Sequence, residues 1–337
     1  MFIIIGASSF IGVYTATCFL EHGEEVIVTG RNNKFKDYYD EYKNATYTNL
    51  DLSKPEDFEK LPKKGVDGVI LISGALPASE DADLKEKENA DLYIRINTLG
   101  TINALEYCRR NGIKRLINTV SYSDVGNLLT ENPPMDENLP REFSYKGDHS
   151  VYIISKNAAT DVMEYYNQQH GMSNAWFRLT PVYGVGPHGN LKVNGRIRKS
   201  GFQIFIDKAS AGEDIEVYGY LARDTVYVKD VAKAYYLASK SEKAYGCYNI
   251  TSGKTTTLLE QAQVCAELFA KDSGHRSNVI YLENMVNPGK SYLFSIEKAK
   301  KDFGYKPDYA DFKTMMIDYK KELDRGVYSS LFSTREV

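Results

Sequence analysis

The chain has 337 residues, of which 42% are hydrophobic and 26% are charged, as is ordinary for a globular protein of two domains. Its formal net charge of -3 gives no basic surface for nucleic acid, and no segment approaches the roughly 20 apolar residues of a membrane span. We therefore expect neither a nucleic-acid partner nor a membrane partner.

The four cysteines, Cys18, Cys108, Cys247 and Cys265, lie far apart in the sequence. They form no Cys-x-x-Cys pair of the kind that binds zinc, so we expect no metal site. Isolated cysteines suit a reducing compartment. The N-terminus also lacks the basic start and long apolar run of a signal peptide. We expect a cytoplasmic protein.

The first thirty residues predict a nucleotide-binding unit. Residues 2–5 (FIII) are a short apolar run without alternation, which is typical of a strand buried on both faces. The turn GASSFIG (residues 6–12) follows, and residues 13–23 have helical spacing before a second strand at 25–30. In such a unit the helix N-terminus faces the phosphates of a dinucleotide. We expect cofactor contacts from Gly6, Ser8, Ser9, Phe10, Ile11 and Gly12, with Ser9 at the middle position that is usually glycine.

The end of the second strand predicts the type of cofactor. An acidic residue there would bind the ribose hydroxyls of NAD, whereas a basic residue would accept the 2′-phosphate of NADP. This chain has Arg31 there and no acid before Asp37, which favours NADP over NAD, although Arg31 could also cover the adenine or lie in solvent. Further along, Asp51 is placed to hydrogen-bond the adenine amino group, with Leu52 packed on the ring.

The following segments repeat the alternation of strand and helix. A buried strand in residues 65–75 ends in Ser73 and Gly74, small residues that let a cofactor lie close. Residues 90–112 predict one long amphipathic helix, and residues 114–126 predict a strand whose end carries Ser121 and Ser123. Another helix starts near Ser150. This order predicts an α/β fold with a doubly wound parallel sheet of the Rossmann type.

Tyr39, Tyr152 and Tyr236 are among the tyrosines that precede a lysine by four residues, so each begins a Tyr-x-x-x-Lys match. The spacing alone is weak evidence in a chain with 26 tyrosines. Four residues are about one helical turn, so both side chains of such a pair share one helix face. Only Tyr152, with Lys156, follows a strand that ends in serine.

Several segments occur in an order that resembles the extended short-chain dehydrogenases/reductases, in the NAD-dependent epimerase/dehydratase family that includes nucleotide-sugar epimerases. The resemblance covers nearly the whole chain. The segments that carry it are GASSFIG at Gly6, DL at Asp51, NTLGT at Asn97, NTVSYS ending at Ser123, YIISK at Tyr152, RLTPVYG at Arg178, RDTVYVKDVA at Arg223, YNITSG at Tyr248 and SIEKAKKDFGYKP at Ser295.

The resemblance implies catalytic roles for three residues. Tyr152 would act as the acid and base in hydride transfer between a sugar hydroxyl and a nicotinamide, and Lys156 would hold the nicotinamide ribose. The ammonium of Lys156 and the positive nicotinamide ring would lower the pKa of Tyr152 from its usual value near ~10. Ser121 would hold the substrate oxygen, a role for which Ser123 is the alternative. Asn97 matches an asparagine near the family's active site and is expected to contact the cofactor.

The resemblance leaves the reaction open. A dehydratase would need Asp-Glu after the catalytic hydroxyl, but this chain has Tyr122 and Ser123 there. An NAD-retaining epimerase of a nucleotide sugar is the main expectation. An NADPH-dependent reductase of a non-sugar ketone or aldehyde is an alternative that Arg31 allows. A non-catalytic NAD(P)-binding sensor is a second alternative, although such proteins are expected to lose the Tyr-Lys pair or the serine.

The substrate side departs from the family pattern at one position. Pro181 stands where many nucleotide-sugar enzymes have asparagine, and proline offers neither an N–H nor an amide. Arg223 matches an arginine that meets the diphosphate, and together with Ser123 it is a candidate for substrate binding. An internal ion pair of Arg223 with Asp224 or Asp230 is the alternative.

The segments predict two interleaved domains. Residues 1–183 would form the NAD(P)-binding Rossmann domain, to which residues 223–250 return. Residues 184–222 and 251–337 would form a smaller substrate-binding lobe. By family analogy we expect a homodimer that pairs through helices at residues 97–108 and 152–166.

Overall fold

The computed structural model describes residues 1–77, 90–147, 149–186, 190–193, 196–270 and 275–333. Within these residues seven strands form one sheet in the order β13-β6-β5-β4-β1-β2-β3, and every pairing in it is parallel. The strands are β1 Phe2–Ile5, β2 Val26–Gly30, β3 Ala45–Asn49, β4 Gly68–Leu71, β5 Leu116–Ser121, β6 Ala175–Leu179 and β13 Gly246–Ile250. The predicted doubly wound parallel sheet is confirmed.

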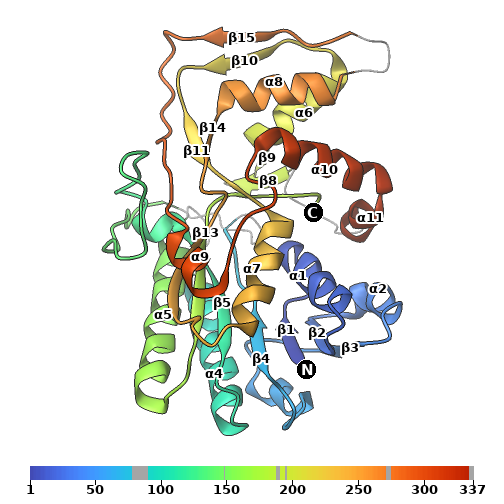
Figure 1. Cartoon of the computed structure of the whole chain (residues 1–337), viewed down its shortest axis with the longest axis vertical. Helices are drawn as coiled ribbons and strands as arrows, with labels where there is room; N and C mark the ends of the chain where they lie inside the picture. The colour runs from blue at the N-terminus through green and yellow to red at the C-terminus, as the bar shows by residue number, and fades with distance from the viewer. Residues whose placement is uncertain (78–89, 148, 187–189, 194–195, 271–274, 334–337) are drawn as a thin grey trace.

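The apolar run of β1 supplies both faces of the sheet. Successive side chains of a strand point to opposite faces. Phe2 and Ile4 accordingly join the core that includes α1 (Phe10–Glu21) and α7 (Val228–Lys240). Ile3 and Ile5 join the core that includes α4 (Gly100–Arg110) and α5 (Ser150–His170). Figure 1 shows the two pairs of helices on either side of the sheet.

A smaller group of elements lies beyond the carboxyl ends of the strands, in the upper part of Figure 1. Its helices are α6 Gly201–Ala211, α8 Leu258–Leu268 and α10 Phe312–Arg325. Its strand pairs are β10 Ile215–Tyr218 with β15 Val279–Leu282, β11 Ala222–Asp224 with β14 Thr255–Thr257, and β8 Asn190–Val193 with β9 Arg196–Lys199. None of the described helices is both long and apolar enough to cross a membrane.

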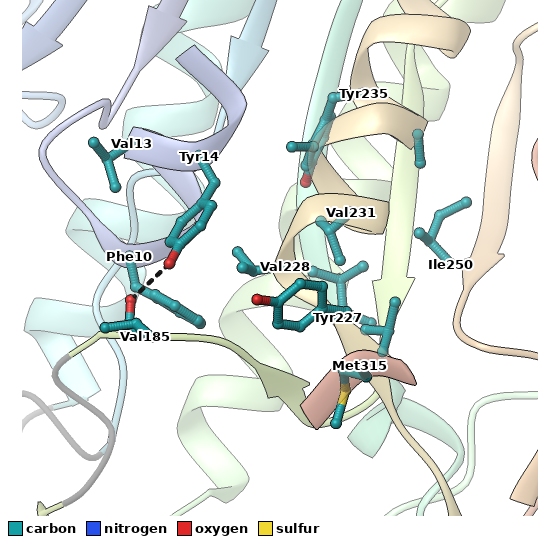
Figure 2. Close-up of a cluster of buried hydrophobic side chains, with 14 of the residues drawn as sticks. Phe10, Val13, Tyr14, Val185, Tyr227, Val228, Val231, Tyr235, Ile250 and Met315 are labelled. Atoms are coloured by element: carbon teal, nitrogen blue, oxygen red, sulfur yellow. Dashed lines mark hydrogen bonds between the residues drawn. The ribbon is translucent and has the colours of Figure 1, made fainter. Parts of the chain in front are cut away.

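The remaining elements connect the two groups or flank the sheet. They are η1 Asn33–Phe35, α2 Lys36–Asp40, η2 Pro55–Lys60, η4 Tyr122–Val125, β7 Val182–Tyr183, β12 Val226–Tyr227, α9 Glu297–Phe303 and α11 Val327–Ser333. Figure 2 shows a hydrophobic cluster where α1, α7 and α10 meet, around Tyr14, Tyr227 and Met315. β13 pairs with β6 and α7 packs on α1, although both follow residue 222 in the chain. The domain boundaries themselves stay predictions.

The helical stretch predicted at residues 90–112 is interrupted. It consists of α3 (Ala90–Tyr93), the π-helical segment η3 (Ile94–Leu99) and α4. The π segment contains Asn97, whose side chain bonds to Ala75 and to Ser155 of α5. These contacts come from other elements, so hydrophobic spacing could not reveal the interruption.

Candidate active site

The turn after β1 can be formed only with glycine at its two ends. Gly6 has a φ of +95°, and a Cβ added to it would lie 2.6 Å from the backbone nitrogen of Ser73. A Cβ on Gly12 would lie 2.0 Å from the carbonyl oxygen of Gly6. The Ser9 hydroxyl donates to that same carbonyl at 2.7 Å and accepts from the N–H of Gly12 at 3.1 Å. Ser9 therefore caps helix α1 at the position where the usual motif has glycine.

The other residues of the turn have different surroundings. The Phe10 ring is buried. It packs directly on the backbone of Gly184 and Gly186, where added Cβ atoms would lie 2.9 Å and 2.4 Å from it. Phe10 therefore binds the turn to the chain segment that enters the smaller group, and only its backbone could face a cofactor. Ile11 is partly buried against the same core. The Ser8 hydroxyl lies beside Gly30 at the end of β2, where an added Cβ would be 2.8 Å from it.

The predicted adenosine-binding residues follow the ends of β2 and β3. Arg31 is exposed directly after Gly30 and makes no ion pair or hydrogen bond with another described residue. The Asp51 carboxylate accepts from the N–H of Ser53 at 3.0 Å and from its hydroxyl at 2.7 Å. Leu52 is buried against Gly100, whose added Cβ would lie 2.5 Å from Leu52 Cγ. The Leu52 side chain is therefore part of the hydrophobic core that also includes α4 and α5.

Ser73 and Gly74 connect the glycine turn to the helix that bears Tyr152. Ser73 donates its N–H to the carbonyl of Ile5 at 3.0 Å. A Cβ on Gly74 would lie 2.9 Å from Asn97 Oδ1 and 3.0 Å from Lys156 Nζ. The buried Asn97 amide donates both of its N–H groups, to the Ala75 carbonyl and the Ser155 hydroxyl, and its oxygen accepts from the N–H of Ala75. Asn97 therefore holds this corner in place, and a direct cofactor contact from it stays a prediction.

Tyr152 and Lys156 lie in the first turns of α5, which packs against β5 and against η4 after it. Lys156 Nζ donates to the carbonyl of Thr119 at 3.0 Å, two residues before Ser121. Ser121 ends β5, accepts from the N–H of Ser123 at 3.2 Å and donates to the Ser123 hydroxyl at 3.0 Å. The helix with the Tyr-Lys pair is thus tied to the strand that ends in the predicted catalytic serine.

The Tyr-x-x-x-Lys matches at Tyr39 and Tyr236 have structural partners. Tyr39 is buried in α2 and donates its hydroxyl to the carbonyl of Ala7 at 2.7 Å. Tyr236 lies in α7, with its ring 4.0 Å from that of His22, and Lys240 pairs with Glu24. Tyr152, by contrast, makes no hydroxyl bond to another described residue.

The pKa values of Tyr152 and Lys156 are both shifted by burial in the protein. Burial raises the pKa of Tyr152, and the neighbouring Tyr93 raises it further. Burial also lowers the pKa of Lys156 to about 8. Lys156 was expected to help lower the pKa of Tyr152, but burial and Tyr93 are the causes that act on this pKa within the protein, and both raise it. A phenolate at Tyr152 therefore needs positive charge from outside the chain.

A buried ion pair that the sequence analysis missed supports the serine turn. Arg178 of β6 donates to both carboxylate oxygens of Asp124, through Nε at 3.0 Å and Nη2 at 2.7 Å. Asp124 lies in η4, three residues after Ser121, and both partners are buried. Arg178 also donates to Asn249 Oδ1 at 3.3 Å. The only signal in the sequence was the arginine of the RLTPVYG segment.

Arg223 has neither of the two ion pairs considered from the sequence. The Asp224 carboxylate accepts from Ser252 and from the N–H of Phe294, and Asp230 accepts from the N–H groups of Asp308 and Tyr309. Arg223 Nε is buried and has no hydrogen-bond partner among the residues that the structure describes. A Cβ on Gly289 would lie 2.6 Å from Arg223 Nη2, so the guanidinium lies against a backbone without a side chain.

Comparison with known proteins adds independent findings. The model of the family described as "NAD dependent epimerase/dehydratase family" matches residues 2–251. A putative UDP-glucose 4-epimerase from Methanocaldococcus jannaschii is 27% identical over 340 residues, which cover 97% of each chain.

The crystal structure of a UDP-N-acetylglucosamine 4-epimerase from Bacillus cereus has a TM-score of 0.75 at 21% identity, over 96% of this chain and 99% of that one. A UDP-glucose 4-epimerase from Thermus thermophilus, in complex with NAD, has a TM-score of 0.69 at 23% identity, over 95% and 98% of the two chains. At this identity the two structures show a shared fold.

Proposed function

Because this chain belongs to the NAD-dependent epimerase/dehydratase family, we propose that it is an epimerase that inverts a hydroxyl-bearing carbon of a nucleotide sugar. The family makes it an NAD-dependent enzyme of the extended short-chain dehydrogenase/reductase type. The named relatives are 4-epimerases of UDP-sugars, which supports a UDP-sugar as substrate here. The reductase and the sensor considered from the sequence are less well supported.

One observation carries the proposal: the bond from Lys156 Nζ to the Thr119 carbonyl. It brings the turn of α5 that bears Tyr152 to the end of β5, where Ser121 lies. The same lysine lies beside Gly74, which adjoins Ser73 and the glycine turn. An acid–base tyrosine, a hydroxyl and a dinucleotide-binding turn are then parts of one site.

The residues fit a bound nicotinamide dinucleotide. Gly6, Gly12 and Gly74 let the turn and the strand ends pack closely against Ser73, Asn97 and Lys156, and the N-terminus of α1 would face the pyrophosphate. Asp51 and Arg31 would hold the adenosine end, and Lys156 would hold the nicotinamide ribose. When bound, NAD would supply the acceptor and donor of a hydride.

The protein's own groups would move the proton and hold the sugar. Tyr152 would remove the proton from the sugar hydroxyl and return it after the sugar has presented its other face. Because burial raises the pKa of Tyr152, the phenolate that takes the proton would need the positive charge of a bound nicotinamide ring. Ser121 would hydrogen-bond the reacting oxygen, with Ser123 supporting it through their mutual bond. Arg223, with its unpartnered buried Nε, would bind the diphosphate.

The proposal is tested by incubating the protein with UDP-glucose and with UDP-N-acetylglucosamine and following the anomeric protons by NMR. We expect one of these two sugar nucleotides to convert to its C4 epimer without added reductant. The conversion should stop when the substrate and its epimer have reached equilibrium. A product that accumulates only when NADPH is consumed would instead support the reductase.

We also propose that Arg31, which follows β2, would bind the 2′-phosphate of NADP, so that the site accepts NADP as well as NAD. A hydrogen bond to a charged group is worth about 1.5–3 kcal/mol, or roughly ten- to a hundredfold in affinity. We expect Arg31→Asp to lower the ratio of NADP affinity to NAD affinity by about tenfold or more in calorimetric titrations. Lys43→Asp, which makes the same charge change at another exposed position, should leave the ratio unchanged. An unchanged ratio in Arg31→Asp would reject this role.

A homodimer through α4 and α5 stays part of the proposal. Leu99, Ile154 and Tyr165 are exposed apolar side chains on or next to these helices, which supports a face that a second copy could cover. A solution mass of one chain in sedimentation equilibrium would contradict the dimer. Cytoplasmic location also remains a prediction, supported by four cysteines without disulfide bonds.

A further inference from the structure

The C-terminal helix α11 returns from the smaller group of elements to the nucleotide-binding half. Gly326, which ends α10, has a φ of +71°, a left-handed conformation that suits glycine at a helix end. The chain then turns into α11, which Figure 1 shows next to α1 and α2. Tyr328 and Phe332 of α11 are both buried. They are four residues apart, so they lie on one face of the helix.

Phe332 contacts the segment that follows the strand end of β2. Its ring centre lies 5.6 Å from that of Phe35. Phe35 is buried in η1, which starts two residues after Arg31. η1 and α2 are three and five residues long. The contact with Phe332 is one of those that hold this segment, together with the bonds of Tyr38 to Thr17 and of Tyr39 to Ala7.

Tyr328 contacts helix α1, which begins at the end of the glycine turn. Its ring stacks on Tyr14 of α1 with centres 4.0 Å apart. Tyr14 lies one turn after Phe10, contacts the Phe10 ring edge-on at 5.8 Å and donates its hydroxyl to the Val185 carbonyl at 3.1 Å; Figure 2 shows the Tyr14–Val185 bond. α11 thus reaches both the first turn of α1 and the loop after β2.

A third contact joins these two segments at the glycine turn. Tyr39, four residues after Phe35, donates its hydroxyl to the carbonyl of Ala7, inside the turn between Gly6 and Gly12. Tyr47 donates to the carbonyl of Asn32 at 2.6 Å from the other side of the loop. A shift of Phe35 would therefore reach the backbone of the glycine turn as well as Arg31.

We propose that α11 positions the cofactor site: Phe332 and Tyr328 hold the loop after β2 and the start of α1 in the arrangement that binds the adenosine half of the nucleotide. This inference rests on the cofactor site of the proposed function. Phe332 is a positioning residue, since it acts through Phe35. If its loss lowers the fraction of molecules with a binding-competent loop, the apparent dissociation constant rises in inverse proportion.

The test is the affinity for ADP-ribose, which has the adenosine half of the cofactor without nicotinamide, measured by calorimetry on nucleotide-free protein. We expect Phe332→Ala to weaken binding about tenfold and Phe332→Leu about threefold. The control is Phe303→Ala: Phe303 is similarly buried but packs against Phe177 and Tyr248 near β13, at the other edge of the sheet. It should lose stability and keep its affinity within about twofold.

The outcomes separate the two proposals. Unchanged affinity in both Phe332 variants, or an equal loss in Phe303→Ala, would overturn the role of α11. If Phe332→Ala does not fold, Phe332→Leu carries the test alone, and its unchanged affinity would count against the proposal. A wild-type protein that binds neither ADP-ribose nor NAD would refute the cofactor site itself, and the role of α11 with it.

Discussion

Tyr152→Phe is expected to lower the turnover of the nucleotide sugar by about a thousandfold, within the range for loss of a general acid–base group. The substitution removes only the hydroxyl that would take and return the proton. In the structure that hydroxyl bonds to no other described residue, and the ring packs against Tyr93 at 6.3 Å. We therefore expect the free energy of unfolding and the NAD affinity to stay near the wild-type values.

The matched control is Tyr236→Phe. Tyr236 also begins a Tyr-x-x-x-Lys segment on a helix, but it packs on His22 and Phe19. Its variant should retain full turnover in the same NMR assay. A Tyr152→Phe enzyme that works within about tenfold of the wild type would reject Tyr152 as the acid and base, whereas loss of NAD binding would mean that the hydroxyl holds the cofactor instead.

Arg178→Met is expected to lower the free energy of unfolding by about 3–5 kcal/mol, because it leaves the buried carboxylate of Asp124 without its partner. Arg178 donates three hydrogen bonds to Asp124 and one to Asn249, and neither ion-pair partner has much contact with water. Urea denaturation measures the change. A loss below about 1 kcal/mol would show that Asp124 finds water or another donor.

The double variant Arg178→Met with Asp124→Leu separates stability from site geometry. Replacing a buried ion pair by apolar side chains is often neutral, so most of the lost stability should return. Turnover should stay low, because Asp124 fixes the turn that follows Ser121. Full activity in the double variant would contradict the role of the ion pair in holding that turn.

The parallel sheet could be predicted from the sequence because its signals are local. The apolar run at residues 2–5, the glycine turn and the helical spacing after it lie within thirty residues and became β1, the turn and α1. The choice of Tyr152 over Tyr39 and Tyr236 also used local information, namely the serine at the end of the preceding strand. Tyr39 and Tyr236 both have structural partners.

What the sequence analysis missed depends on contacts between distant segments. Arg178 and Asp124 are 54 positions apart, and Asn97 reaches Ser155 across 58. No spacing rule joins such residues, so the ion pair behind Ser121 and the π segment at Asn97 could not be predicted. Burial raises the pKa of Tyr152 in the protein alone, and this burial could not be read from the sequence; a lower pKa with the nicotinamide ring bound stays a prediction.

Mass spectrometry of the nucleotide released when freshly purified protein is denatured tests the central claim most directly. An epimerase that returns its hydride within each cycle has no need to release its cofactor, so we predict NAD at close to one molecule per chain. A site that is empty on purification and then binds NADPH more tightly than NADH would contradict a retained NAD and would favour the reductase that Arg31 allows.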